Sequence, residues 1–361
     1  QRNGNIMQNA VNFVSDGLGL TPPEFAEVLG HCTETGQVQL DSYALGGMVE
    51  QVEQKFADLL GKEQAVFMPT GTMANHIALR ELAGAQGKVI VQAESHIYRD
   101  IGDGPQTLSG LNLIPLGAKR AAFTLAEVEE AVQSLLVERV ATHVRVISIE
   151  SPVRRLDDAM FGFEEMTKIS AYAHQQGIKM HLDGARLFVE AAHTGADPTD
   201  IATHFDTVFV SLSKCFNCAS GAVLAGPASV MKDVYHTRRM FGGSLPQAWP
   251  QAAVALHYAD TFLQAYRSAW PIAEALFAAL DAHEGFRVEY IPNGTHIVRL
   301  LVPGKNLDHF RDLLHAHQVH LPPVDEDGES FRLKVNPSAN HTSAENLVEA
   351  FRAAHTASDP A

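Results

Sequence analysis

The sequence predicts an α/β fold in which a mainly parallel sheet is sandwiched by helices, with a smaller α+β domain at the C-terminal end. Over residues 65–210, short apolar runs of strand length alternate with amphipathic stretches of helical length, which is typical of parallel sheets covered on both faces. After Trp249 and Pro250 the pattern changes to long, alanine-rich helical stretches. We therefore expect an N-terminal segment (1–35), a large domain (36–247) and a small domain (248–361).

The elements of the large domain follow from hydrophobic periodicity and turn residues. A helix is expected over residues 49–60, where apolar side chains recur at helical spacing and Gly61 can end the helix. Further helices are expected at 24–29, 73–82, 125–136 and 163–176, and strands at 65–68, 89–91, 144–150, 179–182 and 207–210. Sheets of this kind bind ligands at the carboxyl ends of their strands. Four charged residues lie at or shortly after the ends of these strands: Glu94, Glu150, Asp183 and Lys214.

The small domain has strands and helices in a different order. Helices are expected at 251–268, 271–283, 307–317 and 343–355, and strands at 287–290, 297–302 and around Arg332. Such a domain would act as a lid that brings Arg332 over the ligand site of the large domain.

Composition excludes several classes of function. With 361 residues, 46% of them hydrophobic and 19% charged, the chain can bury a large core. A formal net charge of -15 argues against nucleic acid or an anionic lipid surface as a partner. No apolar run approaches the roughly 18 residues that cross a membrane. The sequence contains no recognisable signal peptide, so a cytoplasmic location is expected; the start at Gln1 leaves open an export signal removed before it.

The three cysteines do not indicate a disulfide framework or a metal site. Cys215 and Cys218 have the two-residue spacing of redox and zinc sites, but no second cysteine pair or suitably spaced histidines accompany them. We expect no metal, and we expect both side chains to pack around the loop after Lys214. A thiol with a lowered pKa is the alternative.

Lys214 and Asp183 carry the chemical prediction. Lys214 follows the apolar strand 207–210, and Asp183 follows the strand 179–182. A lysine amine can form a Schiff base with the aldehyde of pyridoxal phosphate, and a carboxylate can keep the pyridine nitrogen of that cofactor protonated. Each residue alone has a plainer interpretation: Lys214 as a solvated strand-end lysine, and Asp183 as a helix N-cap.

Two further segments supply what such a cofactor needs. The turn Thr70-Gly71-Thr72 leads from a strand into a helix, where free backbone N–H groups and the helix dipole suit a phosphate. His96 follows the strand 89–91 and could stack on a pyridine ring. An ordinary N-cap and an ordinary turn histidine are the plain alternatives.

Together these segments resemble fold-type I pyridoxal-phosphate enzymes, and within them the threonine aldolase and beta-eliminating lyase family. The resemblance covers most of residues 12–247, with a weaker match around Arg332. The matching segments are Ser15-Asp16, Phe67 to Asn75, Glu94 to Ile97, His181 to Phe188, Ser211 to Lys214, and Arg238 to Gly243. The most specific are Asp183-Gly184-Ala185-Arg186 and Ser211-Leu212-Ser213-Lys214.

The resemblance implies roles for individual residues. Lys214 would bond to the cofactor aldehyde, Asp183 would pair with the ring nitrogen, and His96 would stack on the ring. The phosphate would be held by Gly71, Thr72 and Ser211. The substrate carboxylate would be bound by Arg186 and Arg332, with Ser15 beside them, because a guanidinium fork suits a carboxylate. A salt bridge and a solvated face are the plain alternatives for the two arginines.

The chain departs from the family pattern at several positions. Val153 stands where the family has a histidine near the substrate hydroxyl, and a valine cannot exchange a proton. Cys215 replaces a glycine after the lysine, and Pro246 replaces an arginine that reaches a phosphate across a subunit boundary. An acidic, proline-containing loop is replaced by residues 45–47.

We expect a lyase that cleaves a β-hydroxy α-amino acid to glycine and an aldehyde, as threonine aldolases do. With Val153 in place, the base for the β-hydroxyl would be His96 or a water held by Glu94. An α,β-eliminating lyase, which needs only Lys214 as a base, is the second choice, and an aminotransferase is less favoured. No Gly-x-Gly-x-x-Gly opens a helix, which disfavours a nucleotide-binding dehydrogenase. A non-catalytic interaction protein on the same fold would not bind the cofactor. The resemblance implies a homodimer or homotetramer.

Overall fold

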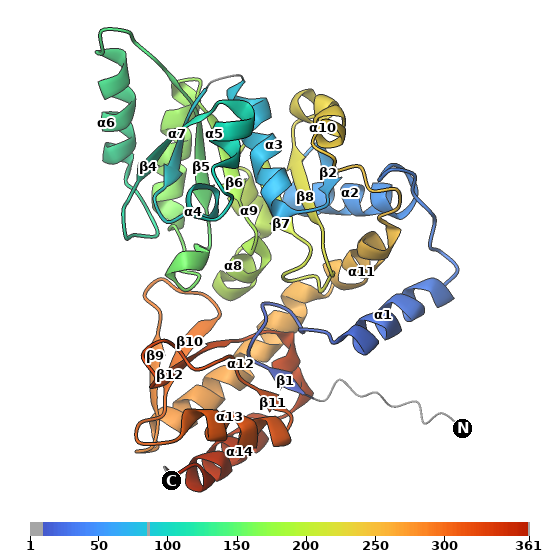
Figure 1. The fold of residues 1–361 in the computed structure, drawn as a ribbon, viewed down its shortest axis with the longest axis vertical. Coiled ribbons are helices and arrows are strands. Elements are labelled where there is room, and N and C mark those ends of the chain that lie inside the picture. Colours follow the sequence, from blue (N-terminus) through green and yellow to red (C-terminus); the bar gives the residue numbers. More distant parts are fainter. Residues whose placement is uncertain (1–9, 85–86, 360–361) are drawn as a thin grey trace.

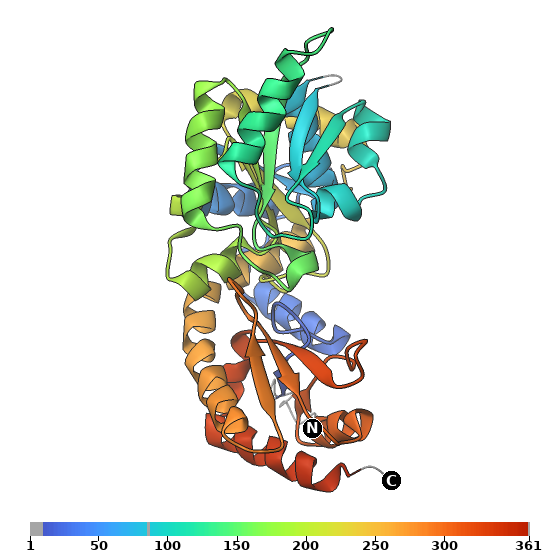
Figure 2. The same cartoon turned by 90° about the vertical axis from the view of Figure 1, so that its left-hand side faces the viewer.

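The computed structural model describes residues 10–84 and 87–359, which form two lobes (Figures 1 and 2). One lobe contains a seven-stranded sheet, and the other contains a three-stranded sheet. The long helix α12 (Phe262–Asp281) runs from the first lobe along the second.

The large sheet has the strand order β2-β8-β7-β6-β5-β3-β4. Its strands are β2 (Gln64–Met68), β3 (Lys88–Gln92), β4 (Asn112–Leu116), β5 (Val144–Glu150), β6 (Lys179–Asp183), β7 (Thr207–Ser211) and β8 (Ala222–Gly226). The five strands from β7 to β4 are mutually parallel, and β8 is antiparallel to both of its neighbours. The predicted mainly parallel sheet is therefore confirmed.

Helices cover both faces of this sheet (Figure 1). They are α2 (Gly47–Leu60), α3 (Gly71–Ala83), α4 (His96–Arg99), α5 (Gly104–Ser109), α6 (Leu125–Leu136), α7 (Phe163–Gln175), α8 (Leu187–Thr194), α9 (Pro198–Ala202), α10 (Ala228–Met240) and α11 (Trp249–Ala259). Gly61 ends α2 with a φ of 60°, as its position predicts. β7 and β8 are buried along their whole length. Residues at or beyond the ends of these strands are therefore best placed to contact a ligand.

The carboxyl ends of β5, β6 and β7 lie next to one another. Glu150 is in register with Asp183, and Asp183 is in register with Phe209. Lys214 follows three residues after the end of β7. The register therefore brings the residues predicted for the site to one edge of the sheet, as expected for parallel strands.

The second lobe contains the C-terminal part of the chain and one N-terminal strand. Its antiparallel sheet is formed by β9 (Arg287–Tyr290), β10 (Ile297–Leu301) and β12 (Ser330–Lys334), with α13 (Leu307–Ala316) and α14 (Ala344–Ala357) packed nearby. A two-residue strand, β1 (Val11–Asn12), pairs in parallel with β11 (Val319–His320). α1 (Pro22–Glu34) follows β1 along the chain and lies beside the junction of the lobes in Figure 1.

The helices after Trp249 differ from the expected pair. The predicted helix at 251–268 is interrupted at Asp260 and Thr261, and the predicted helix at 271–283 is the second half of α12, with Pro271 inside it. Within α12, Tyr266 belongs to one hydrophobic core and Ala273 to a second, and Trp270 packs against both. The domain boundaries at 35 and 247 stay predictions, and residues 1–9 of the first segment lie outside the described residues.

In the described ranges, no helix combines the length and apolar character that a bilayer-spanning segment requires.

Candidate active site

A cavity of about 220 Å³ lies at the carboxyl edge of the large sheet. Seven of the residues predicted for the site line it: Gly71, Thr72, His96, Asp183, Arg186, Ser211 and Lys214. Glu150, Arg154, Ala185, Phe209 and Ser213 complete the lining. Segments from five different parts of the chain thus converge on one space.

Lys214 lies on the loop after β7 and lines two cavities. It lines the cavity above and also a second, more open one of about 570 Å³. Within the described ranges its amine has no hydrogen bond or ion pair. Burial lowers the pKa of Lys214, and the nearby Arg186 lowers it further. A larger fraction of the amine is therefore neutral and nucleophilic than for an exposed lysine.

Asp183 is a buried carboxylate at the end of β6. Its Oδ2 accepts a hydrogen bond from Asn75 Nδ2 at 2.7 Å, and its Oδ1 accepts one from the backbone N–H of Ala185 at 3.2 Å. Burial raises the pKa of Asp183, although His96 and Asn75 partly offset this. The bond to Ala185 is the local contact that an N-cap interpretation predicts, but helix α8 begins only at Leu187.

Asn75 connects Asp183 to a second buried layer. Its Oδ1 is 2.9 Å from His181 Nε2, and His181 Nδ1 is 2.8 Å from the Thr207 hydroxyl. The chain Thr207–His181–Asn75–Asp183 fixes the carboxylate orientation through buried hydrogen bonds. Asn75 was not among the predicted site residues; its signal is its position on α3, one turn after Gly71 and facing the sheet.

The start of α3 and the end of β7 offer further hydrogen-bond donors to the cavity. Thr70 caps α3 and accepts a hydrogen bond from Met73 at 3.2 Å, so the turn is an N-cap, as its plain interpretation states. The backbone N–H groups of Gly71 and Thr72 belong to the first turn and have no intrahelical acceptor. The Ser211 hydroxyl is 3.2 Å from that of Ser213.

His96 is held between two carboxylates. Its backbone N–H donates to Glu150 Oε2 at 2.5 Å, and its Nδ1 lies 3.4 Å from Asp100. Asp100 also pairs with Arg154 and Arg155. Burial and Asp183 raise the pKa of Glu150 to about 8, so near neutral pH this carboxyl group can hold or release a proton.

The two predicted carboxylate-binding arginines occupy different environments. Arg186 is buried, lines the smaller cavity, and donates from Nε to Asp16 Oδ2 at 3.0 Å. Arg332 lines neither cavity near Lys214 and pairs with Asp157 at 2.9 Å and Asp325 at 2.7 Å. Its role as a substrate ligand stays a prediction.

Lys334 lies closer to the site than Arg332 does. It lines the larger cavity together with Ser15, Asp16 and Lys214, and its Nζ is 3.0 Å from Asp16. It was not predicted, but the strand alternation that exposes Arg332 on β12 places Lys334 on the same face. Ser15 thus has a placement next to Lys214, although it does not line the smaller cavity.

Val153 and Glu94 do not supply a base to the cavity. Val153 is fully buried and forms an isolated bridge with Ala159. Glu94 accepts from the backbone of Lys119 at 3.1 Å and lies 3.6 Å from Arg99, and it lines neither cavity. Two carboxyl groups line the smaller cavity instead, those of Glu150 and Asp183.

All three cysteines are free thiols; Cys215 and Cys218 are buried, and Cys32 is partly exposed. Burial raises the pKa of both Cys215 and Cys218, which is opposite to the lowered thiol pKa considered as an alternative. Their side chains pack in the main core, as expected for residues around the loop after Lys214.

The site fits the polar groups of pyridoxal phosphate. An amine without a protein partner suits an aldehyde, a buried carboxylate suits a protonated ring nitrogen, and N–H groups at a helix start suit a phosphate. A sheet of this order with this lysine and aspartate at neighbouring strand ends defines the class of fold-type I pyridoxal-phosphate enzymes.

Comparisons with known proteins agree with this class. The beta-eliminating lyase family model matches residues 34–300. The chain is 27% identical over 263 residues to a low-specificity L-threonine aldolase of Candida albicans, which covers 72% of this chain and 68% of that protein. It is 26% identical to low-specificity L-threonine aldolase 1 of Arabidopsis thaliana, over 69% of this chain and 70% of that protein. The chain therefore belongs to the beta-eliminating lyase family.

Solved structures show the same fold. A crystal structure of a proposed L-allo-threonine aldolase from Listeria monocytogenes has a TM-score of 0.79 and 25% identity, with 97% of each chain covered. A proposed aromatic amino acid beta-eliminating lyase/threonine aldolase from Exiguobacterium has a TM-score of 0.76 and 27% identity, over 97% of this chain and 98% of that one. The likeness includes both lobes.

Proposed function

We propose that the chain is a pyridoxal-phosphate-dependent lyase that cleaves a β-hydroxy α-amino acid to glycine and an aldehyde. The observation that carries this proposal is that one cavity is lined by Lys214, whose amine has no partner among residues 10–84 and 87–359, by the buried carboxylate of Asp183 and by the start of α3. The names of the relatives support the choice of reaction.

Each residue has a proposed task. When bound, pyridoxal phosphate supplies an aldehyde that bonds to amines and a protonated ring that withdraws electrons from the substrate α-carbon. Asp183 would hold the proton on the ring nitrogen, and Lys214 would offer its neutral amine. Gly71, Thr72 and Ser211 would bind the phosphate, and the His96 ring would pack against the cofactor ring. Arg186 would bind the substrate carboxylate.

The proton of the β-hydroxyl group needs a base for the aldol cleavage. Two groups of the cavity lining are candidates: the His96 imidazole and the Glu150 carboxyl group. The pKa of about 8 for Glu150 is close to the operating range that favours general-base catalysis.

An α,β-eliminating lyase is the second candidate, and Val153 is the observation that favours it. Elimination needs a base only for the α-proton, which Lys214 can provide, and therefore does not need a side chain at position 153 that exchanges protons.

The test is a titration of the holoenzyme with glycine, threonine, phenylserine and serine, followed by product analysis. Aldehyde together with glycine is the expected result from threonine and phenylserine. Ammonia with a keto acid would decide for elimination. The variant Lys214→Ala should lose both the visible absorbance of the bound cofactor and the activity, and retention of both would contradict the assignment of Lys214.

We further propose a homodimer or homotetramer in the cytoplasm. Support comes from exposed apolar side chains on residues 40–45 and at the end of α10, where Arg239 lies over the Tyr43 ring at 5.4 Å. Light scattering after size-exclusion chromatography tests the assembly: a mass near that of one 39.2 kDa chain would contradict it. Fractionation of the source cells tests the location.

A further inference from the structure

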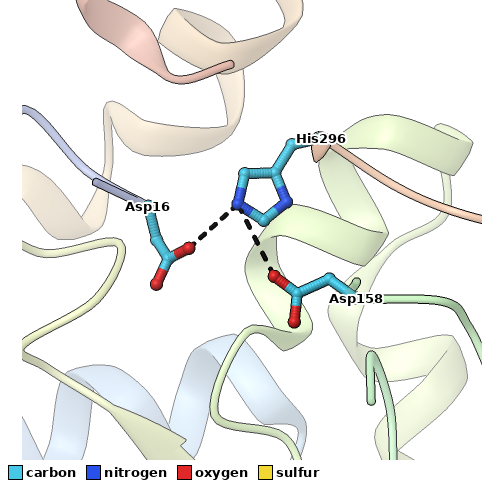
Figure 3. Close-up of side chains that lie close together, drawn as sticks. All are labelled: Asp16, Asp158 and His296. Atoms are coloured by element: carbon cyan, nitrogen blue, oxygen red, sulfur yellow. Dashed lines mark hydrogen bonds and ion pairs between the residues drawn. The ribbon is translucent and has the colours of Figure 1, made fainter. Parts of the chain in front are cut away.

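A buried cluster of charged residues lies next to Arg186, and one of its members, Asp16, also lines the larger cavity. Figure 3 shows its three central members, Asp16, Asp158 and His296, with the imidazole pointing toward both carboxylates. His296 Nε2 is 2.9 Å from Asp16 Oδ1 and 3.8 Å from Asp158 Oδ2. All three side chains are at most 5% exposed. Charged side chains that are buried to this degree need compensating partners.

The ligand atoms lie close enough together to hold a metal ion, but their existing partners argue against one. Asp16 Oδ2 accepts from Arg186 Nε at 3.0 Å, and Asp16 Oδ1 is 3.0 Å from Lys334 Nζ. Two fixed positive charges already balance the two carboxylates. A divalent cation at the same point would be repelled by Arg186 and Lys334, and buried charges are poorly screened.

The partners of Arg186 are all on one edge of its guanidinium group. Nε donates to Asp16 and lies 3.4 Å from Asp158 Oδ2. Among the described residues, Nη1 and Nη2 of Arg186 donate no hydrogen bond. Neither nitrogen belongs to the fully buried polar atoms that lack a partner, so both can be reached from outside the packed interior. Arg186 also lines the cofactor cavity. The two terminal nitrogens are therefore the part of the fork that remains for a ligand.

Asp158 is placed at a conformational cost. Asp157 and Asp158 both have left-handed backbone conformations, with φ of 53° and 55°, which non-glycine residues rarely adopt. Asp158 Oδ1 is buried and has no hydrogen-bond partner. Its backbone is held by two contacts: its N–H donates to Val153 at 3.1 Å, and its carbonyl accepts from the Thr295 hydroxyl at 3.1 Å. Strained, poorly satisfied groups of this kind tend to occur at functional sites.

We propose that Asp16 and Asp158 are positioning residues for Arg186, which hold its Nε edge so that Nη1 and Nη2 face the cavity and bind the carboxylate of an amino-acid substrate. This inference rests on the proposed function. Asp16 contributes more than Asp158 to holding Arg186 in place, because only Asp16 accepts a hydrogen bond from Nε. His296 and Lys334 hold Asp16 from the C-terminal lobe, so the orientation of the fork depends on the contact between the lobes.

The test compares ligands with and without a carboxylate. Dissociation constants for glycine and for ethanolamine are measured from the visible absorbance of the holoenzyme, and that for pyridoxal phosphate on the cofactor-free protein. Asp16→Asn should weaken glycine binding about tenfold or more, since a charge-assisted hydrogen bond is lost. Asp158→Asn should weaken it about threefold, because that pair lacks hydrogen-bond geometry. Ethanolamine and pyridoxal phosphate should bind within about twofold of the unmodified protein.

Asp103→Asn is the matched control, because Asp103 is exposed and has the same left-handed backbone, with a φ of 54°. It should leave all three constants unchanged. In an Arg186→Lys background, Asp16→Asn should have no further effect on glycine binding, since the two residues act as a unit.

Several outcomes would overturn the proposal. Unchanged glycine binding in Asp16→Asn is one, and equal weakening of glycine and ethanolamine is another, because it would indicate a general structural role. Tighter glycine binding on addition of Ca²⁺ or Mn²⁺, abolished by Asp158→Asn, would establish a metal site instead. If the variants show the expected changes in glycine binding but the unmodified holoenzyme forms no aldehyde from threonine, the proposed reaction is wrong and the positioning role of Asp16 and Asp158 is still supported.

Discussion

Asp183 illustrates how much of the site depends on a single side chain in a fixed environment. Its carboxylate is buried and keeps one oxygen on Asn75 and the other on the backbone of Ala185. Such a group can hold a proton on a ring nitrogen because it is fixed before the ligand arrives and its charge is poorly screened. Its pKa, raised by burial, also means that an unpaired negative charge is unfavourable here, so a positively charged partner is stabilised.

Replacing Asp183 by alanine should separate cofactor binding from catalysis. We expect the variant to bind pyridoxal phosphate but to turn over threonine at least about 100-fold more slowly, because a ring without a stabilised proton is a poor electron acceptor. Absorbance and activity measured on the same sample check this. Turnover within twofold of the unmodified protein would show that the ring nitrogen has another partner.

Some residues that line the cavity could be predicted from the sequence, whereas the positions of others depend on tertiary packing. Lys214, Asp183 and Gly71 were predictable because the sequence shows where strands end and helices begin. Side chains at the carboxyl ends of parallel strands and N–H groups at helix starts are the groups that can contact a ligand. The cluster next to Arg186 was not predictable, since Asp16, Asp158 and His296 are brought together from positions up to 280 residues apart. No periodicity reports a contact of that kind.

At the scale of elements, the start of α3 packs directly against the sheet. A Cβ atom added at Gly71 would lie 2.3 Å from Phe209 Cζ, and Phe209 is almost fully buried on β7. Phe209 packs in a core cluster and also lines the cavity, so displacing its ring would disturb both. Glycine at this position lets the helix start approach the cavity closely.

Gly71→Ala should destabilise the protein by about 1–3 kcal/mol, as overpacking does, and should weaken binding of pyridoxal phosphate. The control is Gly30→Ala in α1, where no atom lies within 4 Å of the added Cβ. That change should be neutral or stabilise by about 0.5–1 kcal/mol. Thermal unfolding and titration with pyridoxal phosphate measure stability and cofactor affinity for both variants. Equal stability and equal affinity of the two variants would contradict the packing argument.

Helix α8 contains a buried acid that makes stability depend on pH. Burial raises the pKa of Glu190 to about 7, although the Ser151 hydroxyl donates to it at 2.6 Å and partly offsets this. A raised folded-state pKa means that the folded state retains a proton that the unfolded state releases. Stability is therefore lost as the pH rises from the unfolded pKa, about 4.5, through about 7.

Glu190→Gln should remove this loss, since glutamine can still accept from Ser151 and cannot ionise. The difference in free energy of unfolding between variant and parent should be small near pH 4.5 and reach about 3 kcal/mol in favour of the variant above pH 7. Urea unfolding at pH 5 and pH 8 measures it. A difference that does not grow with pH would show that Glu190 is not protonated in the folded protein.

Sequence periodicity located most of the strands and helices but not all of their ends. It missed β8, whose five residues are apolar or glycine and show no alternation. The sequence also predicts that a new helix begins at Pro271, because proline is favoured in the first turn of a helix. In the structure α12 continues through Pro271, and its packing against both cores outweighs the missing hydrogen bond to the carbonyl of Arg267.

At the scale of the whole molecule, the site depends on the contact between the two lobes. β12 presents Arg332 and Lys334 on one face, and both pair with acidic residues of other segments. Arg332 is about half exposed, with 44% of its side chain accessible, so its ion pairs contribute little to stability. Lys334 is more enclosed and lines the cavity that Lys214 shares.

We therefore expect Lys334→Ala to weaken glycine binding more than Arg332→Ala does. Loss of Lys334 removes a cation from the cavity and also a partner that holds Asp16 in place, whereas loss of Arg332 removes two ion pairs outside both cavities. A roughly tenfold effect for Lys334 against about twofold for Arg332 is the expected ratio, by the usual difference between enclosed and exposed charged contacts. Glycine titration of the two holoenzyme variants measures it, with pyridoxal phosphate affinity as the internal control. The reverse order would mean that the lobes close further when substrate binds, so that Arg332 moves over the cofactor as the sequence predicts.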